Sequence, residues 1–366
     1  MMKQGIVVVG GYGQVGQVVC HELAKFFPGN VYAAGRSYEK AKRFSDDQGG
    51  RVLPLQMDIN EGIPEDFFQD VSLVVMCLDL RDTGFVQACI DHQVDYVDIT
   101  ADYSVIAGIE KLSPAGSTVV LSVGLAPGLT NMLAKQGKQR LDTARLADIY
   151  VLLGLGEAHG RAAIEWTIDN LAADFSVLEY GRKRQVASFT EGKKTRFPAP
   201  FGQRTAYRFN FSDQHVIPRT LDIPSVSTRL CFDSPLVTRT AAGLKRAGGL
   251  GWLERPSIRN KAVDLMESWR WGSENFAAKV DVWGEKDGRQ TIYQGSVCGV
   301  REGYVTGRVA AYVAEKLARE RQPFGVFHSE KLFQPAELFM ELEDVITLEE
   351  RIIDIESHEE KGGMAR

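Results

Sequence analysis

The sequence predicts an α/β protein with a doubly wound parallel sheet and a second, α+β domain whose sheet is largely antiparallel. Three observations predict this fold class. A glycine-rich turn joins an apolar strand to a helix near the N-terminus, strands and helices then alternate with short links up to residue 123, and after residue 131 shorter, turn-rich segments replace them. Alternation with short links is typical of parallel sheets covered by helices, whereas successive short strands favour antiparallel pairing.

The first strand and the turn after it predict a phosphate site. Residues 6–9 form a continuous β-branched run, Gly11, Gly13 and Gly16 follow in the spacing G-x-G-x-x-G, and residues 14–27 have a helical pattern. The first glycine of such a turn allows the bend, the second lets a pyrophosphate approach, and the third lets the helix pack on the strand. The residues expected to bind the pyrophosphate are Gly11, Tyr12, Gly13, Gln14 and Val15. The alternative is a glycine-rich turn that binds no nucleotide.

The end of the second strand predicts which dinucleotide binds. Residues 31–34 form this strand, and an Asp or Glu after it would bind the ribose 2′-hydroxyl of NAD. This chain has Gly35, Arg36 and Ser37 instead, so no carboxylate repels a 2′-phosphate and a guanidinium can pair with it. We therefore expect NADP(H) to be preferred, with NAD(H) possible. In the alternative interpretation Arg36 is only a solvated surface residue.

The remaining elements of the first domain bring more side chains to one edge of the sheet. Helices are predicted over residues 38–48, 82–92 and 104–112, and strands over residues 51–57, 71–78, 96–99 and 118–123. Ligands of such sheets bind at the carboxyl ends of the strands. The residues at those ends that we expect beside the nucleotide are Asp58, Cys77, Leu78, Asp98, Gly124 and Pro127.

The second domain has a different pattern. Strands are predicted over residues 146–155 and 226–232, and a helix over residues 162–173. Lys286-Asp287-Gly288 lies between two apolar runs and predicts a hairpin with Asp-Gly at its turn. The chain after residue 348 is charged and is expected to be solvated.

Composition narrows the class of protein. The 366 residues carry a net charge of −5, with 44% hydrophobic and 25% charged residues, which is ordinary for a soluble globular protein and implies no attraction to nucleic acid or membrane. The five cysteines and six histidines are scattered, so we expect buried thiols in a reducing cytoplasm, no metal site and no disulfide.

Several segments together resemble the saccharopine dehydrogenase family. They are GGYGQVG at residues 10–16, AGRS at 34–37, QMDI at 56–59, ACIDHQVDYVDIT at 88–100, GLAPGLTNMLA at 124–134, GRAAIEWTIDN at 160–170 and FGVFHSEKL at 324–332. The resemblance covers most of the chain, and it is most specific in the nucleotide-binding half.

The resemblance implies a Rossmann domain over residues 1–130, a substrate and dimerisation domain over residues 131–300, and a C-terminal segment, residues 301–366, that returns to the first. It also implies a homodimeric pyridine-nucleotide oxidoreductase acting on C–N bonds of amino acids. By the same resemblance Arg36 and Ser37 contact the ribose and its phosphate, and the side chains assigned to the adenine edge, the ribose and the nicotinamide are Asp58, Cys77, Leu78, Gly124 and Pro127.

Two residues are candidates for catalysis. Asp98 ends a strand in the crevice and could orient an amine or a water, or only accept loop N–H bonds. His159 follows the first strand of the second domain and could titrate near neutral pH, or be a surface residue without a role. Cys77 is expected to be a small buried hydrophobe rather than a nucleophile. Arginines that could bind a substrate carboxylate are Arg161, Arg204, Arg208, Arg219 and Arg229.

The leading hypothesis is a cytoplasmic NADP(H)-dependent oxidoreductase that reduces an imine of an amino-acid-like small molecule, or oxidises the corresponding amine. Two alternatives stay open. One is a reductase of a carbonyl or C=C bond on a larger metabolite. The other is a protein that binds NADP(H) without turnover and acts as a sensor.

Overall fold

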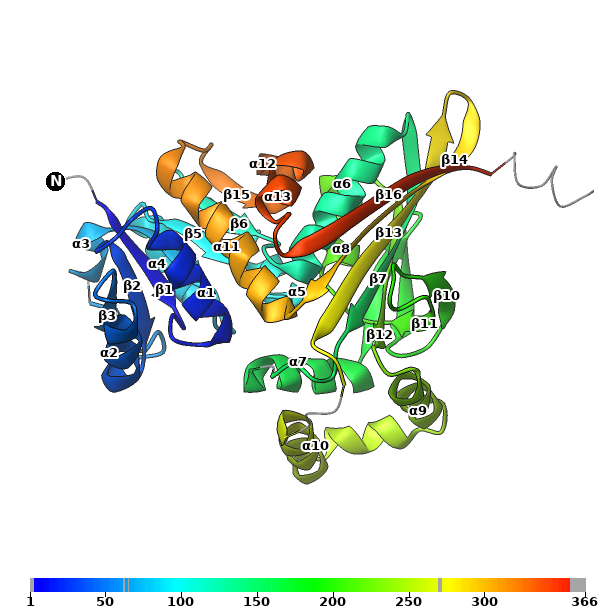
Figure 1. The fold of residues 1–366 in the computed structure, drawn as a ribbon, viewed down its shortest axis with the longest axis horizontal. Helices are drawn as coiled ribbons and strands as arrows, with labels where there is room; N and C mark the ends of the chain where they lie inside the picture. Colours follow the sequence, from blue (N-terminus) through cyan, green and yellow to red (C-terminus); the bar gives the residue numbers. More distant parts are fainter. Residues whose placement is uncertain (1–2, 62, 65, 159, 269–271, 356–366) are drawn as a thin grey trace, which may run out of the picture. The chain divides into compact units, whose positions relative to one another are not determined.

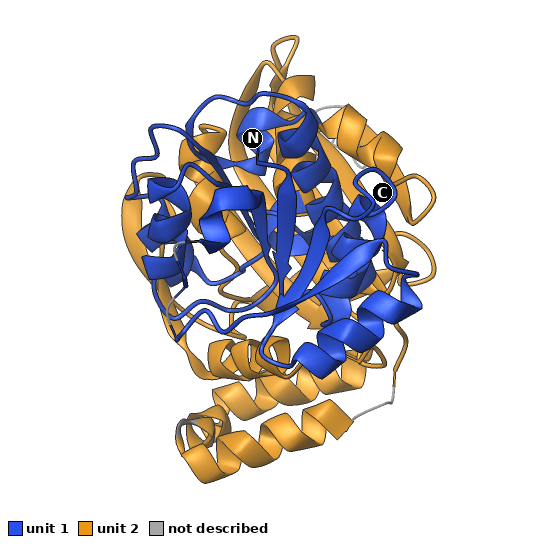
Figure 2. Cartoon of the chain, turned by 90° about the vertical axis from the view of Figure 1, so that its left-hand side faces the viewer, with its two compact units in different colours: residues 1–128, 303–334 blue, residues 129–302, 335–366 orange. Residues whose placement is uncertain are grey.

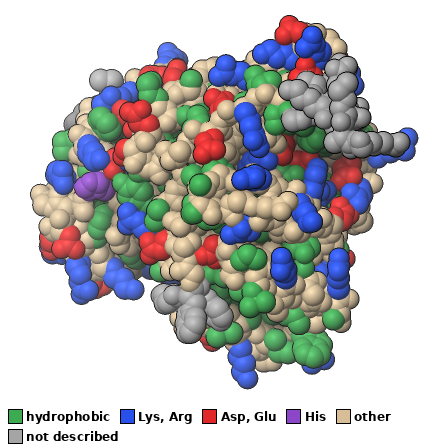
Figure 3. Space-filling view, turned by 45° about the vertical axis from the view of Figure 1, so that its right-hand side comes forward, with side chains coloured by type: hydrophobic (Ala, Val, Ile, Leu, Met, Phe, Trp, Pro, Cys, Tyr) green, Lys and Arg blue, Asp and Glu red, His purple; other side chains and the backbone are tan. Residues whose placement is uncertain are grey.

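The chain folds into two compact units that interleave along the sequence. The computed structural model describes residues 3–355, apart from residues 62, 65, 159 and 269–271. Unit 1 comprises Met1–Gly128 and Gly303–Gln334, and unit 2 comprises Leu129–Glu302 and Pro335–Arg366 (Figure 2). The predicted C-terminal segment, residues 301–366, is therefore divided between the two units. Acidic, basic and apolar side chains are interspersed over the face drawn in Figure 3.

Unit 1 contains a seven-stranded parallel sheet in the order β15-β6-β5-β4-β1-β2-β3 (Figure 1). Its strands are buried because their sequences are nearly continuous apolar runs, which suits a sheet covered on both faces. The strands are β1 (Gly5–Val9), β2 (Val31–Gly35), β3 (Val52–Gln56), β4 (Val71–Met76), β5 (Asp95–Asp98), β6 (Thr118–Leu121) and β15 (Gly325–His328). This sheet confirms the doubly wound parallel class.

The helices of unit 1 come from both parts of its sequence. They are α1 (Gln14–Leu23), α2 (Tyr38–Asp47), α3 (Phe67–Asp70), α4 (Gly84–Asp91), α5 (Tyr103–Ile109), α11 (Glu302–Arg319) and α12 (Ser329–Leu332). Helix α11 packs closely on α1, since a Cβ added to Gly307 would lie 2.7 Å from Cβ of Val18. The late segment thus builds the same core as the N-terminal helix. Among the described residues, no helix is long and apolar enough to cross a bilayer.

Unit 2 is built on a nine-stranded mixed sheet, which confirms the predicted α+β domain. Seven strands follow the order β10-β11-β12-β7-β13-β14-β16; β8 pairs with β12, and β9 pairs with β8. The pairing of β12 with β7 is parallel, and its other pairings are antiparallel. The strands are β7 (Thr143–Leu153), β8 (Asp174–Glu179), β9 (Arg182–Ala187), β10 (Lys193–Arg196), β11 (Gln203–Arg208), β12 (Ser225–Phe232), β13 (Asn275–Lys286), β14 (Arg289–Val300) and β16 (Ile346–Asp354).

Two features of this sheet bear on the predictions. The hairpin at Asp287-Gly288 is confirmed: Lys286 pairs with Arg289, and both turn residues have positive φ, 51° and 73°. The chain after residue 348 is not merely solvated, because β16 pairs with β14 from Ile346 to Asp354 while most of its side chains stay exposed.

Helices of unit 2 pack on this sheet and on one another. They are α6 (Thr130–Arg140), α7 (Arg161–Ala172), α8 (Asp213–Thr220), α9 (Pro235–Arg246), η2 (Gly249–Glu254), α10 (Pro256–Ser268) and α13 (Pro335–Glu341). Gly137 lets α6 lie against the sheet, since a Cβ there would lie 2.6 Å from Val282. Ile164 and Ile168 of α7 form a separate small core with Val263 of α10.

Candidate functional site

The glycine turn of unit 1 has two glycines where a side chain would collide with the backbone and one where a side chain would make only a single tight contact. A Cβ on Gly11 would lie 2.6 Å from Cα of Ala33, and one on Gly16 would lie well inside 3.0 Å of the Gly10 carbonyl oxygen. A Cβ on Gly13 would meet only that same oxygen, at 3.1 Å. Gly13 is exposed, and it precedes α1 without any side-chain cap. The protein's own packing explains Gly11 and Gly16, whereas a bare backbone at Gly13 fits the close approach of a phosphate to the helix N-terminus.

The end of β2 is joined to this turn by Tyr12. The Tyr12 hydroxyl accepts a hydrogen bond from the Ser37 backbone N–H at 3.1 Å, and its ring lies beside Gly35. Ser37 caps α2, since its hydroxyl oxygen accepts a hydrogen bond from the Lys40 N–H at 3.3 Å. Ser37 is thus held as a cap, and Arg36 beside it has an exposed side chain.

A cavity of about 750 Å³ lies at the carboxyl ends of β2 and β3. Arg36 and Asp58 both line it, as do Glu61 and Asp66. Hydrogen bonds from the backbone and side chain of Asn60 hold the pKa of Asp58 below its usual range, and Arg36 contributes a further attraction. One guanidinium therefore shares the cavity with three carboxylates, so a bound 2′-phosphate would meet both attraction and repulsion.

Leu78 and Cys77 lie at the end of β4, next to the glycine turn. Leu78 has 44% of its surface exposed, and a Cβ on Gly10 would lie 2.9 Å from it. An exposed apolar side chain beside the turn could pack on a ribose or a ring of the cofactor. The pKa of the Cys77 thiol is raised by burial and by the nearby Asp98 carboxylate, so this thiol stays protonated at neutral pH. That agrees with a packing role for Cys77 rather than a nucleophilic one.

The turn that carries Gly124 and Pro127 is tied to α11. It comprises Leu125–Leu129 (η1), with positive φ at Gly124 and Gly128, 153° and 135°, and a cis peptide bond before Pro127. The Leu125 N–H donates to the Thr306 hydroxyl of α11 at 3.2 Å. Residues from late in the sequence thus hold the segment predicted to line the nicotinamide.

Ser122, just before this turn, is held by a chain of hydrogen bonds through His328 to Glu110, which the sequence did not predict. The Ser122 hydroxyl is 2.8 Å from Nδ1 of His328, and His328 Nε2 is 2.7 Å from a Glu110 carboxylate oxygen. The Ser329 hydroxyl donates to the Ser122 carbonyl at 2.6 Å. Ser122 has the unusual φ of +57° and is fully buried, as expected for a residue held by its neighbours. Its partners lie more than 200 positions away, so no local pattern could reveal them.

Asp98 is enclosed by its own strand and loop. Its side chain is fully buried, one carboxylate oxygen accepts from the Tyr96 hydroxyl at 2.8 Å, and the other accepts from the Thr100 N–H at 2.8 Å. Burial raises its pKa to about 6, although these two hydrogen bonds oppose the shift. This geometry supports the loop-bonding alternative. The second catalytic candidate, His159, lies outside the described residues.

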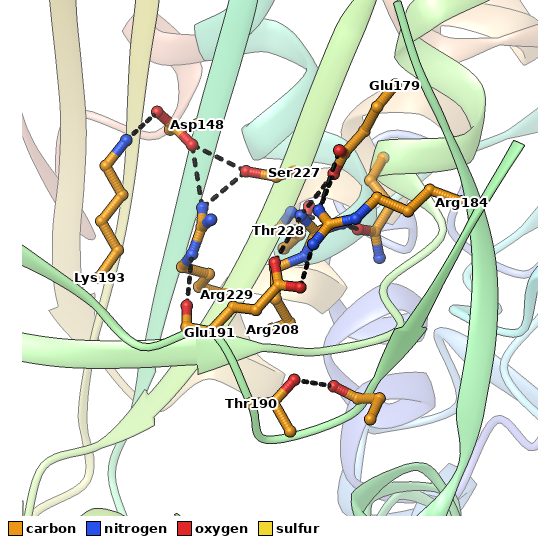
Figure 4. A network of polar contacts seen from close by, with 12 residues as sticks. Asp148, Glu179, Arg184, Thr190, Glu191, Lys193, Arg208, Ser227, Thr228 and Arg229 are labelled. Atoms are coloured by element: carbon orange, nitrogen blue, oxygen red, sulfur yellow. Dashed lines mark hydrogen bonds and ion pairs between the residues drawn. The ribbon is translucent and has the colours of Figure 1, made fainter. Parts of the chain in front are cut away.

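The arginines of unit 2 that could bind a substrate carboxylate already have partners within the protein. Arg208 is 1% exposed and is 2.9 Å from Glu179, while Arg229 is 2.9 Å from Asp148 (Figure 4). On the surface, Arg161 pairs with Glu165, Asp264 and Glu267. Arg219 donates to the His215 carbonyl, and Arg204 to that of Gln203.

Ion pairs on the strands of unit 2 form a charged layer, which comprises Asp148 of β7, Glu179 of β8, Lys193 of β10, Arg208 of β11, Arg229 of β12, and Lys279 and Asp281 of β13. Lys193 joins Asp148 at 2.6 Å, opposite Arg229, and Ser227 donates to the same carboxylate at 2.8 Å. Burial alone would raise the pKa of Asp148, but these two cations hold it below its usual range. Lys279 is buried with Asp281, at 2.9 Å. Each carboxylate of the layer therefore has at least one cation beside it.

The predicted residues divide into two groups. Unit 1 brings the glycine turn, Arg36, Ser37, Asp58, Cys77, Leu78, Asp98, Gly124 and Pro127 to the carboxyl edge of one sheet, with Tyr12, Gln14 and Val15 in the turn itself. The candidate arginines are spread over several elements of unit 2. Within the described residues there is no cluster of three or more His, Cys, Asp or Glu side chains that could hold a metal ion.

Comparison with known proteins supports the nucleotide-binding assignment. Residues 6–120 match the family model described as the saccharopine dehydrogenase NADP binding domain, so this part is a saccharopine dehydrogenase-like NAD(P)-binding domain. No curated protein sequence matches the chain significantly.

A solved structure resembles the chain over nearly its whole length. The apo, histidine-tagged saccharopine dehydrogenase (L-Glu forming) of Saccharomyces cerevisiae is 14% identical, with a TM-score of 0.67 over 96% of this chain and 100% of that chain. The two proteins share a fold. DAP dehydrogenase of C. glutamicum is less similar, with a TM-score of 0.44 at 11% identity over 92% of this chain and 96% of that chain. The family match and the fold together support a pyridine-nucleotide oxidoreductase.

Proposed function

We propose that this chain, whose residues 6–120 form a saccharopine dehydrogenase-like NAD(P)-binding domain, is an NADP(H)-dependent oxidoreductase that acts on a C–N bond of an amino-acid-like substrate. It would reduce an imine or oxidise the corresponding amine. The observation that carries the proposal is the glycine turn, whose Gly13 is exposed at the start of α1 and meets one tight contact rather than a collision, inside a saccharopine dehydrogenase-like NAD(P)-binding domain.

The residues of unit 1 would hold the cofactor by distinct contacts. Gly11, Gly13 and the first N–H groups of α1 would bind the pyrophosphate, and Arg36 would contact the 2′-phosphate. Leu78 would pack against the ribose, and the turn with Gly124 and Pro127 would line the nicotinamide. The bound nicotinamide supplies or accepts the hydride. The protein orients it and excludes water.

The preference for NADP(H) rests on Gly35 and Arg36. The three carboxylates in the same cavity oppose it, so the contribution of Arg36 can be measured. Arg36→Ala is expected to weaken NADPH about tenfold and to leave NADH nearly unchanged, because one charge-assisted contact is lost. Dissociation constants for both cofactors, from the nicotinamide fluorescence, test this. If Arg36→Ala leaves the ratio of the NADPH and NADH dissociation constants unaltered, Arg36 is only a solvated surface residue.

Two residues are proposed to assist proton transfer in the reaction, Asp98 indirectly and His159 directly. Asp98 is bound on both carboxylate oxygens and would act by positioning Tyr96 and Thr100. His159 keeps its predicted catalytic role as a proposal. His159→Ala should reduce turnover more than NADPH affinity, and equal loss of both would argue against it.

We also propose that the enzyme is a cytoplasmic homodimer, which sedimentation and fractionation would test.

The decisive experiment is a turnover assay. The purified protein is incubated with NADPH, a panel of keto acids and a panel of amines, and the nicotinamide absorbance is followed. Oxidation that needs both an amine and a keto acid supports imine reduction. Tight NADPH binding without oxidation by any pair would favour the sensor.

A second candidate function has its own supporting observation. The arginines of unit 2 that could hold a substrate carboxylate are already paired with carboxylates or bound to backbone carbonyls. A carbonyl or C=C bond on a larger, apolar metabolite would need no such arginine. NADPH oxidation by aldehydes, ketones or enones without an amine would favour this function.

A further inference from the structure

Tyr12 occupies the space that a side chain at position 35 would need. A Cβ built on Gly35 would lie 2.5 Å from Oη and Cε1 of Tyr12 and 2.6 Å from its Cζ. The ring is fixed at its far end, because Oη accepts the Ser37 N–H at 3.1 Å. The Tyr12 backbone is held as well, since the Gln17 side chain donates to the Tyr12 carbonyl at 2.8 Å. A side chain at position 35 would therefore have to displace the Tyr12 ring and its hydrogen bond to Ser37.

Position 35 is the last residue of β2, where sites for NAD carry the Asp or Glu that binds the ribose 2′-hydroxyl. No such carboxylate fits here while Tyr12 keeps its hydrogen bond to Ser37. The selection against NAD is in this way steric as well as electrostatic.

The Tyr12 hydroxyl also has a hydrogen to offer. A phenol can accept one hydrogen bond and donate another. Its oxygen accepts from the Ser37 backbone, so its own hydrogen can be donated to a neighbouring oxygen. Arg36, next in sequence to Gly35, adds a cation at the same end of β2.

We propose that Tyr12 is a specificity-determining residue for the adenosine 2′-phosphate: its ring excludes a ribose-binding carboxylate from position 35, and its hydroxyl donates to the phosphate. This deepens the proposed NADP(H) function and rests on it. Two side chains far from the nicotinamide, Tyr12 and Arg36, would then set the cofactor preference together.

Calorimetric titration of the full-length protein tests the role of the hydroxyl, with 2′,5′-ADP and 5′-ADP as probes. The wild type should bind 2′,5′-ADP more tightly. Tyr12→Phe keeps the ring and removes the hydroxyl, so it should weaken 2′,5′-ADP about tenfold and leave 5′-ADP within about twofold. Equal binding of the two probes by the wild type, or no loss in Tyr12→Phe, would overturn the proposal.

A double-mutant cycle with NADH tests the steric part. Gly35→Asp alone must displace the Tyr12 ring, so it should gain little NADH affinity. Gly35→Asp combined with Tyr12→Ala makes room for the carboxylate and should bind NADH at least about tenfold more tightly than either single variant. Equal NADH affinity of Gly35→Asp and the double variant would contradict the steric argument.

Folding and catalysis are separated from this result by two controls. Gly35→Ala is the uncharged match for Gly35→Asp, and thermal melting of each variant shows whether it has folded. The titrations involve no turnover. If no substrate pair oxidises NADPH but the 2′-phosphate discrimination follows Tyr12, the proposed reaction fails and this inference stands.

Discussion

The carboxyl edge of the unit 1 sheet and the charged layer of unit 2 differ in how far their functional groups are exposed and paired. At the edge, Gly13 is bare and exposed, Arg36 is exposed, and Leu78 has 44% of its surface in solvent. In the layer, Arg208 is 1% exposed and Asp148 is held by Lys193 and Arg229. At the edge these groups are exposed and can contact a ligand, whereas in the layer the charged groups pair with one another.

This difference distinguishes residues expected to bind a ligand from residues expected to stabilise the fold. Buried charges that pair within a unit need each other, because an unpaired charge in the interior is costly. Exposed groups beside a bare glycine contribute little to folding, so their arrangement reflects what binds there. Substitutions in the layer should therefore change stability and leave nucleotide affinity alone, and substitutions at the edge should do the reverse.

The largest expected effect lies in the layer. Arg208→Ala removes a fully buried side chain together with its hydrogen bonds to Glu179 and Gln214, although Glu179 keeps its pair with Arg184. The loss of charge-assisted hydrogen bonds and of buried volume should lower the free energy of unfolding by about 3–4 kcal/mol. Chemical denaturation measures this loss. Arg208→Met fills the same space without charge and should recover part of it. A normal stability for Arg208→Ala, or an NADPH affinity that falls while the fold persists, would break the comparison.

Asp98 is buried in unit 1, so its substitution, like those in the layer, should change stability. Its folded-state pKa of about 6 exceeds the unfolded value of 3.8, so the native state binds the proton more tightly and stability falls as the pH rises from about 4 to above 6. Asp98→Asn removes this titration. The variant's stability minus that of the wild type should grow by roughly 2–3 kcal/mol between pH 4 and pH 7. Urea denaturation across this range would show a constant difference if the argument is wrong.

The glycine turn sharpens the comparison within one motif. Gly13→Ala adds a Cβ that makes one tight contact, with the Gly10 oxygen at 3.1 Å, so stability should fall much less than in Gly16→Ala while NADPH affinity falls about tenfold or more. Gly16→Ala is the matched control, because its Cβ would collide with the backbone of Gly10 and Gly11. Titration and thermal melting on both variants check this. A Gly13→Ala variant that unfolds would show that the fold, too, needs the bare backbone.

The smallest effect is expected on the surface of unit 2. Arg161 pairs with Glu165, Asp264 and Glu267, but its side chain is 46% exposed, and water and salt screen such pairs. Arg161→Ala should leave the melting temperature and NADPH affinity unchanged within error. A clear fall in melting temperature that disappears in high salt would mean that this surface network stabilises unit 2.

Local patterns in the sequence predicted most of unit 1. The strand of residues 6–9, the glycine turn and the helix after it are encoded within a few neighbouring residues, and the structure has them as β1 and α1. The hairpin at Asp287-Gly288 was predictable for the same reason. The Rossmann and α+β classes followed from how such local elements alternate.

Contacts between distant residues could not be predicted. The partner of Ser122 is His328, and the carboxylates that occupy Arg208 and Arg229 come from other strands. Only part of the role of Gly35 could be predicted. The sequence shows that no acidic residue stands at this position, but it does not show that the Tyr12 ring lies beside it. The prediction of a solvated tail was wrong in part, since residues 349–354 pair with residues of β14 that lie more than 50 positions earlier in the sequence.

The seventh strand of unit 1 has a consequence for how the protein is made. β15 comes from Gly325–His328, and His328 secures Ser122 at the end of β6. A ribosome must therefore translate most of unit 2 before the nascent chain can close the sheet whose first strand emerged at residue 5. Unit 1 therefore begins to be synthesised before unit 2, but its sheet is complete only after residues 129–302 of unit 2 have been made.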